Sequence, residues 1–425
     1  MNLKLGNLNI SLNNLLLYFA LLGPALSFGS FYLFHFLAIL VLISSKYSKV
    51  EKYTLKLVAI PFTLVFYCLI SLIWTPDFFV GLRHVFYFSC GLFILFILVN
   101  YASSVEALEK LFRIFCLVML ANLGIGLLES FNLIRLPASP LSPYANFLGH
   151  EQFDPNELFA DQIEFLYSMP TGFTGNPNNF GFIVLLSFPF IFYYLKNIYL
   201  KFFLFLTTFY LINFIESRGL LVAFFLYIFL YFLVFLFSIK NKNIILFFLS
   251  GLFFLFFLLI KLFSEKLLLI FDDILIAIEM IKYGVVVDYD STGVRSYIYS
   301  KGFDAFLSSP FFGGGIGSMQ TRLIQDNFIL VKSFHFFPFE LLIDIGIVFF
   351  CLILISYVYL IIAMYNIYIR NNNDFLKKIA IACFFSLIIY PFASIVPSST
   401  VYILPFWYVL GLSLATLKVG YYEKA

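Results

Sequence analysis

The chain has few charged residues and few cysteines, and each shortage excludes a class of protein. Only 12% of its 425 residues are charged and the formal net charge is +3, so no basic surface suggests nucleic-acid binding. The five cysteines all lie within apolar runs and form no CxxC pair, which argues against disulfides, structural zinc and a thiol nucleophile. No removable signal peptide is evident, so the first apolar segment after Lys4 is expected to be an uncleaved anchor.

Apolar residues are abundant instead, at 62% of the chain, and they form runs long enough to cross a bilayer. A span needs roughly 20 apolar residues. The runs lack the apolar and polar alternation of barrel strands, so they predict helices. The prediction is an all-α integral membrane protein with about 12 transmembrane helices, and the 61 phenylalanines are most simply explained as lipid-facing bulk. The runs are approximately 12–28, 30–45, 56–74, 81–100, 108–130, 179–195, 200–215, 218–238, 243–262, 336–361, 376–394 and 399–417.

Two long polar intervals divide these spans. The predicted organisation is spans 1–9 over residues 1–263, with a first loop at 132–178, then a larger loop at 264–334, and spans 10–12 over 335–425. The larger loop therefore lies between spans 9 and 10. It begins with an amphipathic segment, 265–282, that is expected to rest on the membrane surface.

Lysine and arginine set the expected orientation. On alternate sides of the twelve spans, one side carries sixteen of the 26 basic residues and the other carries ten, most of which lie in the two long loops. The richer side is predicted to be the cytoplasm. Both termini are then cytoplasmic, and both long loops are extracytoplasmic.

Arginine is distributed the other way. Five of the seven arginines fall on the predicted outer side: Arg83, Arg135, Arg218, Arg295 and Arg322. A guanidinium binds phosphate through two parallel hydrogen bonds, which indicates a phosphate-bearing ligand. Arg83 and Arg218 stand at span ends, where an arginine can instead extend to the membrane interface without any ligand.

Asparagines cluster where the first loop meets the sixth span. Asn176 and Asn178 lie in a turn sequence, Gly175-Asn-Pro-Asn178, and could hydrogen-bond sugar hydroxyls. Helix capping and turn formation are the alternative explanation for both residues.

The larger loop and the span after it carry the chain's most distinctive polar pattern. Arg295 is followed by Gly313, Gly315 and Gly317, which are predicted to form a hinge, and then by His335 at the mouth of a span. A histidine has an ordinary pKa of about 6.5, which suits a general base. A lone histidine between aromatic residues is otherwise most often structural.

These motifs, in this order, resemble the O-antigen ligase and polymerase family of bacterial membrane glycosyltransferases. The resemblance covers residues 175–350 and rests on Gly175-Asn-Pro-Asn178, on Ser217-Arg218-Gly219, on Arg295 with the glycine-rich stretch to Gly317, and on His335 with Asp344-Ile-Gly346. Ligase members carry Asn, Ser or Gln after the histidine and a second glycine three residues after the first. This chain has Phe336 and Phe349 there, which favours the polymerase branch.

The resemblance implies glycan transfer from an undecaprenyl-diphosphate carrier at the outer face of the bacterial inner membrane. It implies that His335 is the catalytic base, that Arg218, Arg295 and Arg83 hold the diphosphate, and that Asp344 joins Asn176 and Asn178 in binding glycan. No metal or other cofactor is expected. The expected partners are the lipid-linked oligosaccharide, membrane lipid and a protein that regulates chain length.

Alternatives from other classes stay open. An O-antigen ligase would transfer the glycan to lipid A core or to protein. A metal-dependent glycosyltransferase would use the Asp-x-Asp of Asp288 and Asp290 or the pair Asp272 and Asp273, since hard divalent cations prefer oxygen ligands. A lipid-linked oligosaccharide flippase or other transporter would need charged residues within its spans, and the spans of this chain are nearly free of them.

Overall fold

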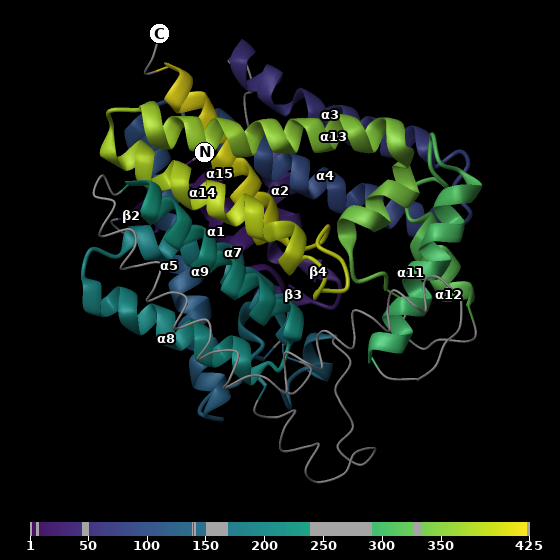
Figure 1. The fold of residues 1–425 in the computed structure, drawn as a ribbon, viewed down its shortest axis with the longest axis horizontal. Coiled ribbons are helices and arrows are strands. Elements are labelled where there is room, and N and C mark those ends of the chain that lie inside the picture. The colour runs from purple at the N-terminus through teal and green to yellow at the C-terminus, as the bar shows by residue number, and fades with distance from the viewer. Residues whose placement is uncertain are drawn as a thin grey trace.

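A computed structural model gives the fold of the chain (Figure 1). The structure describes residues 2–5, 8–44, 51–137, 139, 142–149, 169–238, 291–326 and 333–422.

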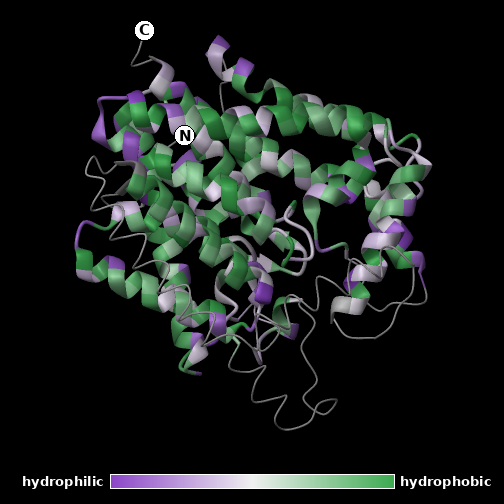
Figure 2. Ribbon diagram, viewed as in Figure 1, coloured by the Kyte–Doolittle hydropathy of each residue, from purple (hydrophilic) through white to green (hydrophobic). Residues whose placement is uncertain are grey.

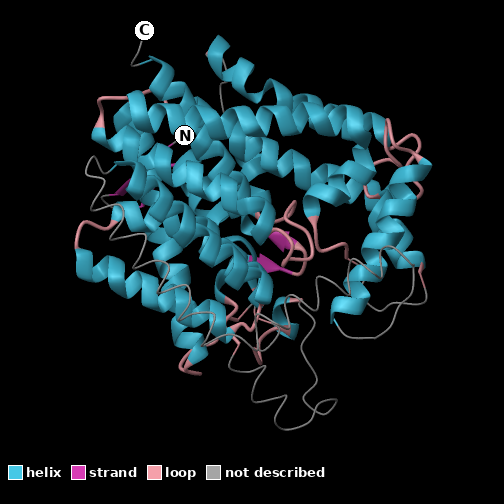
Figure 3. Ribbon diagram, viewed as in Figure 1, coloured by secondary structure: helices cyan, strands magenta, loops and turns pink. Residues whose placement is uncertain are grey.

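Helices dominate the described chain (Figure 3). They are α1 (Leu12–Leu22), α2 (Leu33–Ser44), α3 (Lys52–Ser71), α4 (Phe78–Tyr101), α5 (Val105–Ser130), α7 (Pro177–Tyr194), α8 (Ile198–Phe214), α9 (Arg218–Ser238), α11 (Ser291–Ser308), α12 (Ser318–Gln325), α13 (Phe337–Arg370), α14 (Asp374–Ala393) and α15 (Leu404–Tyr422). Short 3-10 turns are η1 (Gly23–Leu26), η2 (Asn146–Leu148) and η4 (Gly172–Thr174). Two antiparallel hairpins complete the described elements, β1 (Asn2–Leu5) with β2 (Leu8–Ser11) and β3 (Ser27–Phe28) with β4 (Phe31–Tyr32).

The predicted fold class is confirmed as an all-α membrane protein. Six described helices, α3, α4, α5, α9, α13 and α14, are long and apolar enough to cross a membrane, and three shorter apolar helices begin at Leu12, Leu33 and Ile198. Figure 2 shows hydrophobic residues along the helix bodies and hydrophilic ones mainly toward their ends. Every predicted apolar run except 243–262 coincides with a described helix; that run and the segment 265–282 lie outside the described residues.

Polar side chains mark where several of these helices begin. Asp77 accepts hydrogen bonds from the backbone N–H groups of Phe79 and Val80 at the start of α4. Such a cap satisfies backbone donors that have no partner inside the helix. Ser104, Asn176, Asn197 and Asn373 do the same for α5, α7, α8 and α14.

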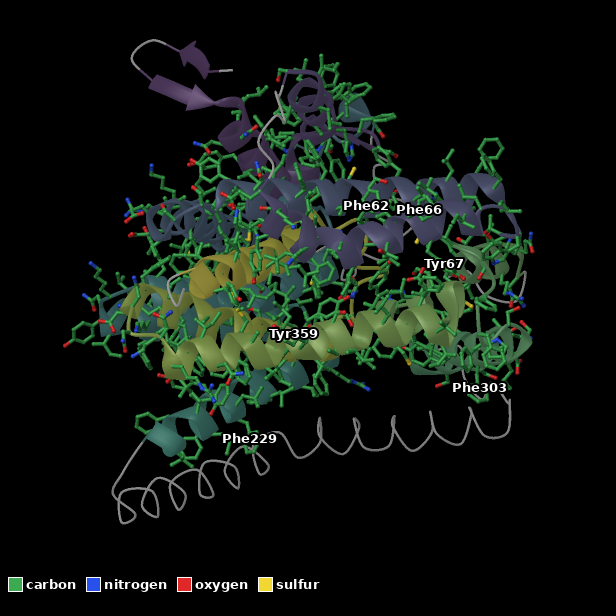
Figure 4. The ribbon with its side chains drawn as sticks, turned by 90° about the horizontal axis from the view of Figure 1, so that it is seen from above. Phe62, Phe66, Tyr67, Phe229, Phe303 and Tyr359 are labelled. Carbon is green, nitrogen blue, oxygen red and sulfur yellow. The ribbon has the colours of Figure 1, made fainter. Side chains whose placement is uncertain are left out.

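The aromatic residues are divided between the interior and the outer surface. Figure 4 labels Phe62 and Phe66 on α3 and Tyr359 on α13, all of which are more than half exposed. Ten phenylalanines are among the largest fully buried side chains, however, so the explanation of phenylalanine as lipid-facing bulk is wrong for these. Glycines make room for such rings. A Cβ at Gly126 would lie 2.1 Å from Phe180, and one at Gly91 would lie 2.2 Å from Trp407.

A buried lysine joins three helix ends on one side of the bundle. Lys418 of α15 is fully buried; its Nζ donates to the Val99 carbonyl at 2.9 Å and pairs with Glu51 at 2.9 Å. Val99 lies near the end of α4, and Glu51 directly precedes α3. The end of α3, the start of α4 and the start of α13 meet on the opposite side, around the glycine-rich loop described below.

The Lys418 contact generates a stability prediction. Glu51→Ala leaves the buried ammonium with a carbonyl as its described partner, and we expect it to destabilise the protein by about 1–3 kcal/mol, since the Glu51 side chain is itself half exposed. Lys418→Met removes the charge together with its need for a partner and should cost less. Thermal unfolding of the detergent-solubilised protein measures both. Equal melting of Glu51→Ala and the parent protein would contradict the proposed contribution of the pair.

Candidate functional site

The glycine-rich loop between α11 and α12 docks onto a break in α13. Gly346 interrupts α13 with a φ of 73° and a ψ of 169°. The loop then hydrogen-bonds the interrupted backbone: Gly314 N–H donates to the Ile343 carbonyl at 3.0 Å, Gly315 N–H donates to the Asp344 carbonyl at 3.1 Å, and Ile347 N–H donates to the Pro310 carbonyl at 2.8 Å. The break exposes backbone groups that would be costly to bury unpaired, and the loop satisfies them.

Glycine is required in this loop for two separate reasons. Gly313, Gly315 and Gly317 all have left-handed φ values, of 74°, 92° and 74°. The backbones also approach closely, because a Cβ on Gly313 would lie 2.3 Å from the Asp344 carbonyl oxygen. These glycines were predicted to form a hinge. The structure gives them a docking role, and their movement stays a prediction.

Three side chains hydrogen-bond the glycine-rich loop from the side of α3: two lie on α3 and one lies just after it. Tyr67 donates to the Phe312 carbonyl at 2.5 Å, Ser71 accepts from Ile316 N–H at 3.1 Å, and Thr75 donates to the Ile316 carbonyl at 2.7 Å. None of these three residues was predicted from the sequence. Their spacing of four was the available signal, because it places hydroxyls on one face of an apolar helix.

Asp344 fixes the helix that follows the loop. Its carboxylate accepts hydrogen bonds from Gly317 N–H at 2.7 Å, Ser318 Oγ at 2.8 Å and Met319 N–H at 3.1 Å, at the start of α12. A helix N-terminus attracts anions, so this contact is favourable. Asp344 is only 2% exposed. The arrangement gives it a positioning role, and its predicted contact with glycan stays a prediction.

Gln320 of α12 connects this helix to α4 through its side-chain oxygen. Its side-chain oxygen accepts from Arg83 Nη2 at 3.1 Å and lies 2.7 Å from His84 Nε2. An amide oxygen only accepts, so His84 carries its proton on Nε2. Arg83 is exposed and His84 is buried. Arg83 is therefore positioned by the same loop and helix that Asp344 organises.

His335 is held in an unusual conformation just before α13. Its φ is 58°, a left-handed value that is uncommon outside glycine. Its N–H donates to the Ser398 carbonyl at 3.2 Å, and its own carbonyl accepts from the Tyr299 hydroxyl at 3.3 Å. On the ring, Nδ1 lies 3.2 Å from the Val396 carbonyl oxygen and Nε2 lies 2.9 Å from Ser333 Oγ.

Arg295 acts on His335 from α11. Burial lowers the pKa of His335, and the positive charge of Arg295 lowers it further, against an opposing effect of the hydrogen bond with Val396. The Arg295 charge acts in the same way on Tyr299, one turn along α11, whose pKa is nonetheless raised by burial. The imidazole is therefore neutral at physiological pH and available as a base.

Arg218 approaches the same segment from another helix. It is the first residue of α9, and a Cβ on the adjacent Gly219 would lie 2.7 Å from Val396, whose carbonyl faces the His335 ring. The structure thus brings the neighbourhoods of Arg218, Arg295 and His335 together, although they are far apart in sequence. Arg83 belongs to the separate group around Gln320.

Asn176 serves as a helix cap. Its Oδ1 accepts from the N–H groups of Asn178 and Asn179 at 2.9 and 3.2 Å, which is the alternative explanation given above. Asn178 is half-buried. Asn179 and Ser398 both lie beside the Tyr402 hydroxyl, which connects the start of α7 to the segment that holds His335.

The turn before α7 is itself fixed by two buried side chains of α5. Glu129 is fully buried and accepts from Thr171 N–H and Gly172 N–H, each at 2.7 Å, while Asn122 accepts from Phe173 N–H at 2.7 Å. These two residues were missed in the sequence. Their spacing of seven, on one face of an otherwise apolar helix, was the signal.

The acidic pairs of the metal-dependent alternative fall outside the described residues: Asp272 with Asp273, and Asp288 with Asp290. Among the residues that the structure describes, no group of three or more His, Cys, Asp or Glu side chains could hold a metal ion.

The fold and the site define a multi-pass membrane protein with a basic and histidine-containing centre at one end of its bundle. Residues 202–354 match the family described as O-antigen ligase, a region that contains Arg218, Arg295, His335 and the glycine-rich loop. The chain is also similar to the teichuronic acid biosynthesis protein TuaE of Bacillus subtilis (strain 168), at 25% identity over 365 residues, which cover 83% of this chain and 70% of that protein. Both matches support the predicted resemblance to the O-antigen ligase and polymerase family.

The docking of the loop predicts a sharp difference between two glycine substitutions. Gly313→Ala combines a left-handed φ with a 2.3 Å approach to backbone, so we expect a loss of about 2–4 kcal/mol of stability together with loss of function. Gly124→Ala is the control, because nothing lies within 4 Å of a Cβ at this position in α5. It should be neutral or slightly stabilising. Thermal unfolding and complementation of a deletion strain test both, and a Gly313→Ala protein as stable as Gly124→Ala would contradict the docking role.

Proposed function

We propose that this protein polymerises oligosaccharide repeat units of an O-antigen, capsule or exopolysaccharide, and that it takes each growing glycan from an undecaprenyl-diphosphate carrier. The observation that carries the proposal is the setting of His335. Its imidazole is neutral, and the positive charge of Arg295 acts on it. The start of α9, which carries Arg218, packs beside the segment that holds the His335 ring. The match to the O-antigen ligase family and the similarity to a teichuronic acid biosynthesis protein support a role in polysaccharide synthesis.

The chemistry follows from the donor. An acceptor hydroxyl loses its proton to His335, its oxygen bonds to the anomeric carbon, and the bond from that carbon to the diphosphate breaks. The diphosphate departs with the bonding electrons. Arg295 and Arg218 neutralise its charge through paired N–H groups, and Arg83, held by Gln320, is the third arginine proposed to contact it.

Phe336 and Phe349 favour the polymerase over the ligase. Phe349 stacks on Tyr67 with ring centroids 3.7 Å apart, and Tyr67 holds the glycine-rich loop. A glycine at this position, as in ligase members, would remove that contact. Transfer of the completed glycan to lipid A core or protein is the second candidate function. A chain-length regulator protein is a proposed partner of the polymerase.

We further propose twelve spans in the bacterial inner membrane, with both termini in the cytoplasm and the His335 end outside. The lysine distribution supports this orientation. Phe147 and Asn372 are both exposed and lie on opposite sides in this arrangement. Cysteines at these positions provide the test. Phe147→Cys should react with a membrane-impermeant thiol reagent in intact spheroplasts, and Asn372→Cys should react only after lysis. Reaction of Asn372→Cys alone would reverse the orientation.

The catalytic assignment is tested on purified protein with lipid-linked oligosaccharide as the sole substrate. His335→Ala should lower the rate by about 10²–10⁴-fold at normal membrane abundance. Because burial and Arg295 lower the pKa of His335, the base form persists below pH of about 6.5, and the rate falls only as pH drops through that lowered pKa.

Two substitutions of Arg295 separate the effect of its positive charge from the effect of its planar guanidinium. Arg295→Gln removes the positive charge, so the pKa of His335 should rise and the acid limb of the pH-rate profile should move to higher pH. Arg295→Lys keeps the charge and should leave that limb in place, while its weaker grip on diphosphate lowers kcat/KM. Full-length chains from His335→Ala at normal abundance would exclude histidine as the base.

A further inference from the structure

Both ring nitrogens of His335 are already engaged, and their partners settle where its proton lies. Nδ1 faces the Val396 carbonyl oxygen at 3.2 Å, and a carbonyl oxygen only accepts. Nδ1 therefore carries the hydrogen in the neutral imidazole. Nε2 presents a lone pair, and the Ser333 hydroxyl, 2.9 Å away, donates to it. The basic nitrogen of the site is thus covered by a serine hydroxyl.

The backbone is arranged to bring this hydroxyl to the ring. His335 has a left-handed φ of 58°, and Ser333, only two positions earlier in the chain, reaches its Nε2. Hydrogen bonds to Ser398 and from Tyr299 hold the turn. Left-handed strain at a non-glycine residue is kept where the surroundings stabilise it, often at functional sites.

A hydroxyl, a base and a group that orients the base are the three parts of a proton-transfer chain. Here they are Ser333 Oγ, the His335 imidazole and the Val396 carbonyl. The half-buried Ser333 hydroxyl occupies the Nε2 lone pair that an acceptor hydroxyl would otherwise have to reach.

We propose that Ser333 is a further catalytic residue that relays the proton of the acceptor hydroxyl to His335. The acceptor O–H bond breaks and its proton bonds to Ser333 Oγ, while the original Ser333 proton passes to His335 Nε2. The acceptor oxygen bonds to the anomeric carbon, and the diphosphate leaves with the electrons of the broken bond. The inference rests on the proposed role of His335 as the base.

Three serine variants test the relay in the full-length protein with purified lipid-linked oligosaccharide. Ser333→Ala removes the hydroxyl and should lower kcat by about 10²-fold with little change in KM. Ser333→Thr keeps a hydroxyl and should recover most of the rate. Ser308→Ala is the control, because the Ser308 hydroxyl bonds only the Ala305 carbonyl among the interactions described, at the end of α11.

Mixed H₂O and D₂O solvents give a readout that a structural role would not affect. Two protons move together in the relay, so the rate of the parent protein and of Ser333→Thr should depend on deuterium fraction along a curve, whereas Ser333→Ala should give a straight line. A Ser333→Ala enzyme with the parent's kcat and curvature overturns the relay. A faster Ser333→Ala enzyme does so too, since it means that the acceptor displaces the serine.

His335→Ala distinguishes failure of the relay from failure of the proposed function. If His335→Ala is inactive and Ser333→Ala is fully active, the relay is wrong and the function stands. If His335→Ala retains full activity, the relay and the assignment of His335 as the base are both wrong. If the parent protein forms no polymer from lipid-linked oligosaccharide, the proposed function is wrong.

Discussion

The break in α13 at Gly346 is the constraint on which the site depends. An unbroken helix would use its own carbonyls, and the glycine-rich loop would have nothing to bind. With the break, backbone groups of α13 become available and the loop pairs with them. The loop in turn starts α12 at the Asp344 carboxylate, and α12 places Gln320 against Arg83 and His84. One irregular residue in a long helix thus orders three other elements.

The polar end of the bundle consists of two groups with different tasks. The Asp344 and Gln320 group is mostly buried, is held by several hydrogen bonds and positions the exposed Arg83. The His335 group is held chiefly by backbone carbonyls of the segment between α14 and α15, so few side chains contact the His335 ring. Burial in the first group gives rigidity. In the second group, burial and the charge of Arg295 together lower the pKa of His335.

Local patterns in the sequence predicted the helices and the residue types of the site, and long-range pairing decided the rest. Hydrophobic runs are local, so each coincides with a described helix wherever the structure describes it. Phenylalanine could not be divided into lipid-facing and buried sets, because a ring is apolar in both settings. His335 and Arg295 could be selected through the order of motifs. Asp344 was selected as well, but its hydrogen bonds to the start of α12 could not be predicted, since its three donors come from 25 to 27 residues earlier in the chain. Ser71, Thr75 and Glu129 escaped notice for the same reason.

The position of the break in α13 also bears on how deep the site lies in the membrane. The part of the helix from Ile347 to Arg370, at about 1.5 Å per residue, is long enough by itself to cross a hydrocarbon core of about 30 Å. The part of α13 before Gly346, together with the loop and α12 that are bound to it, is then not needed for that span. In the proposed orientation, this places the site at the level of the lipid headgroups. The diphosphate of the proposed donor, anchored by its polyprenyl tail, would be confined to that same level, so enzyme and donor would meet in a thin layer instead of a volume.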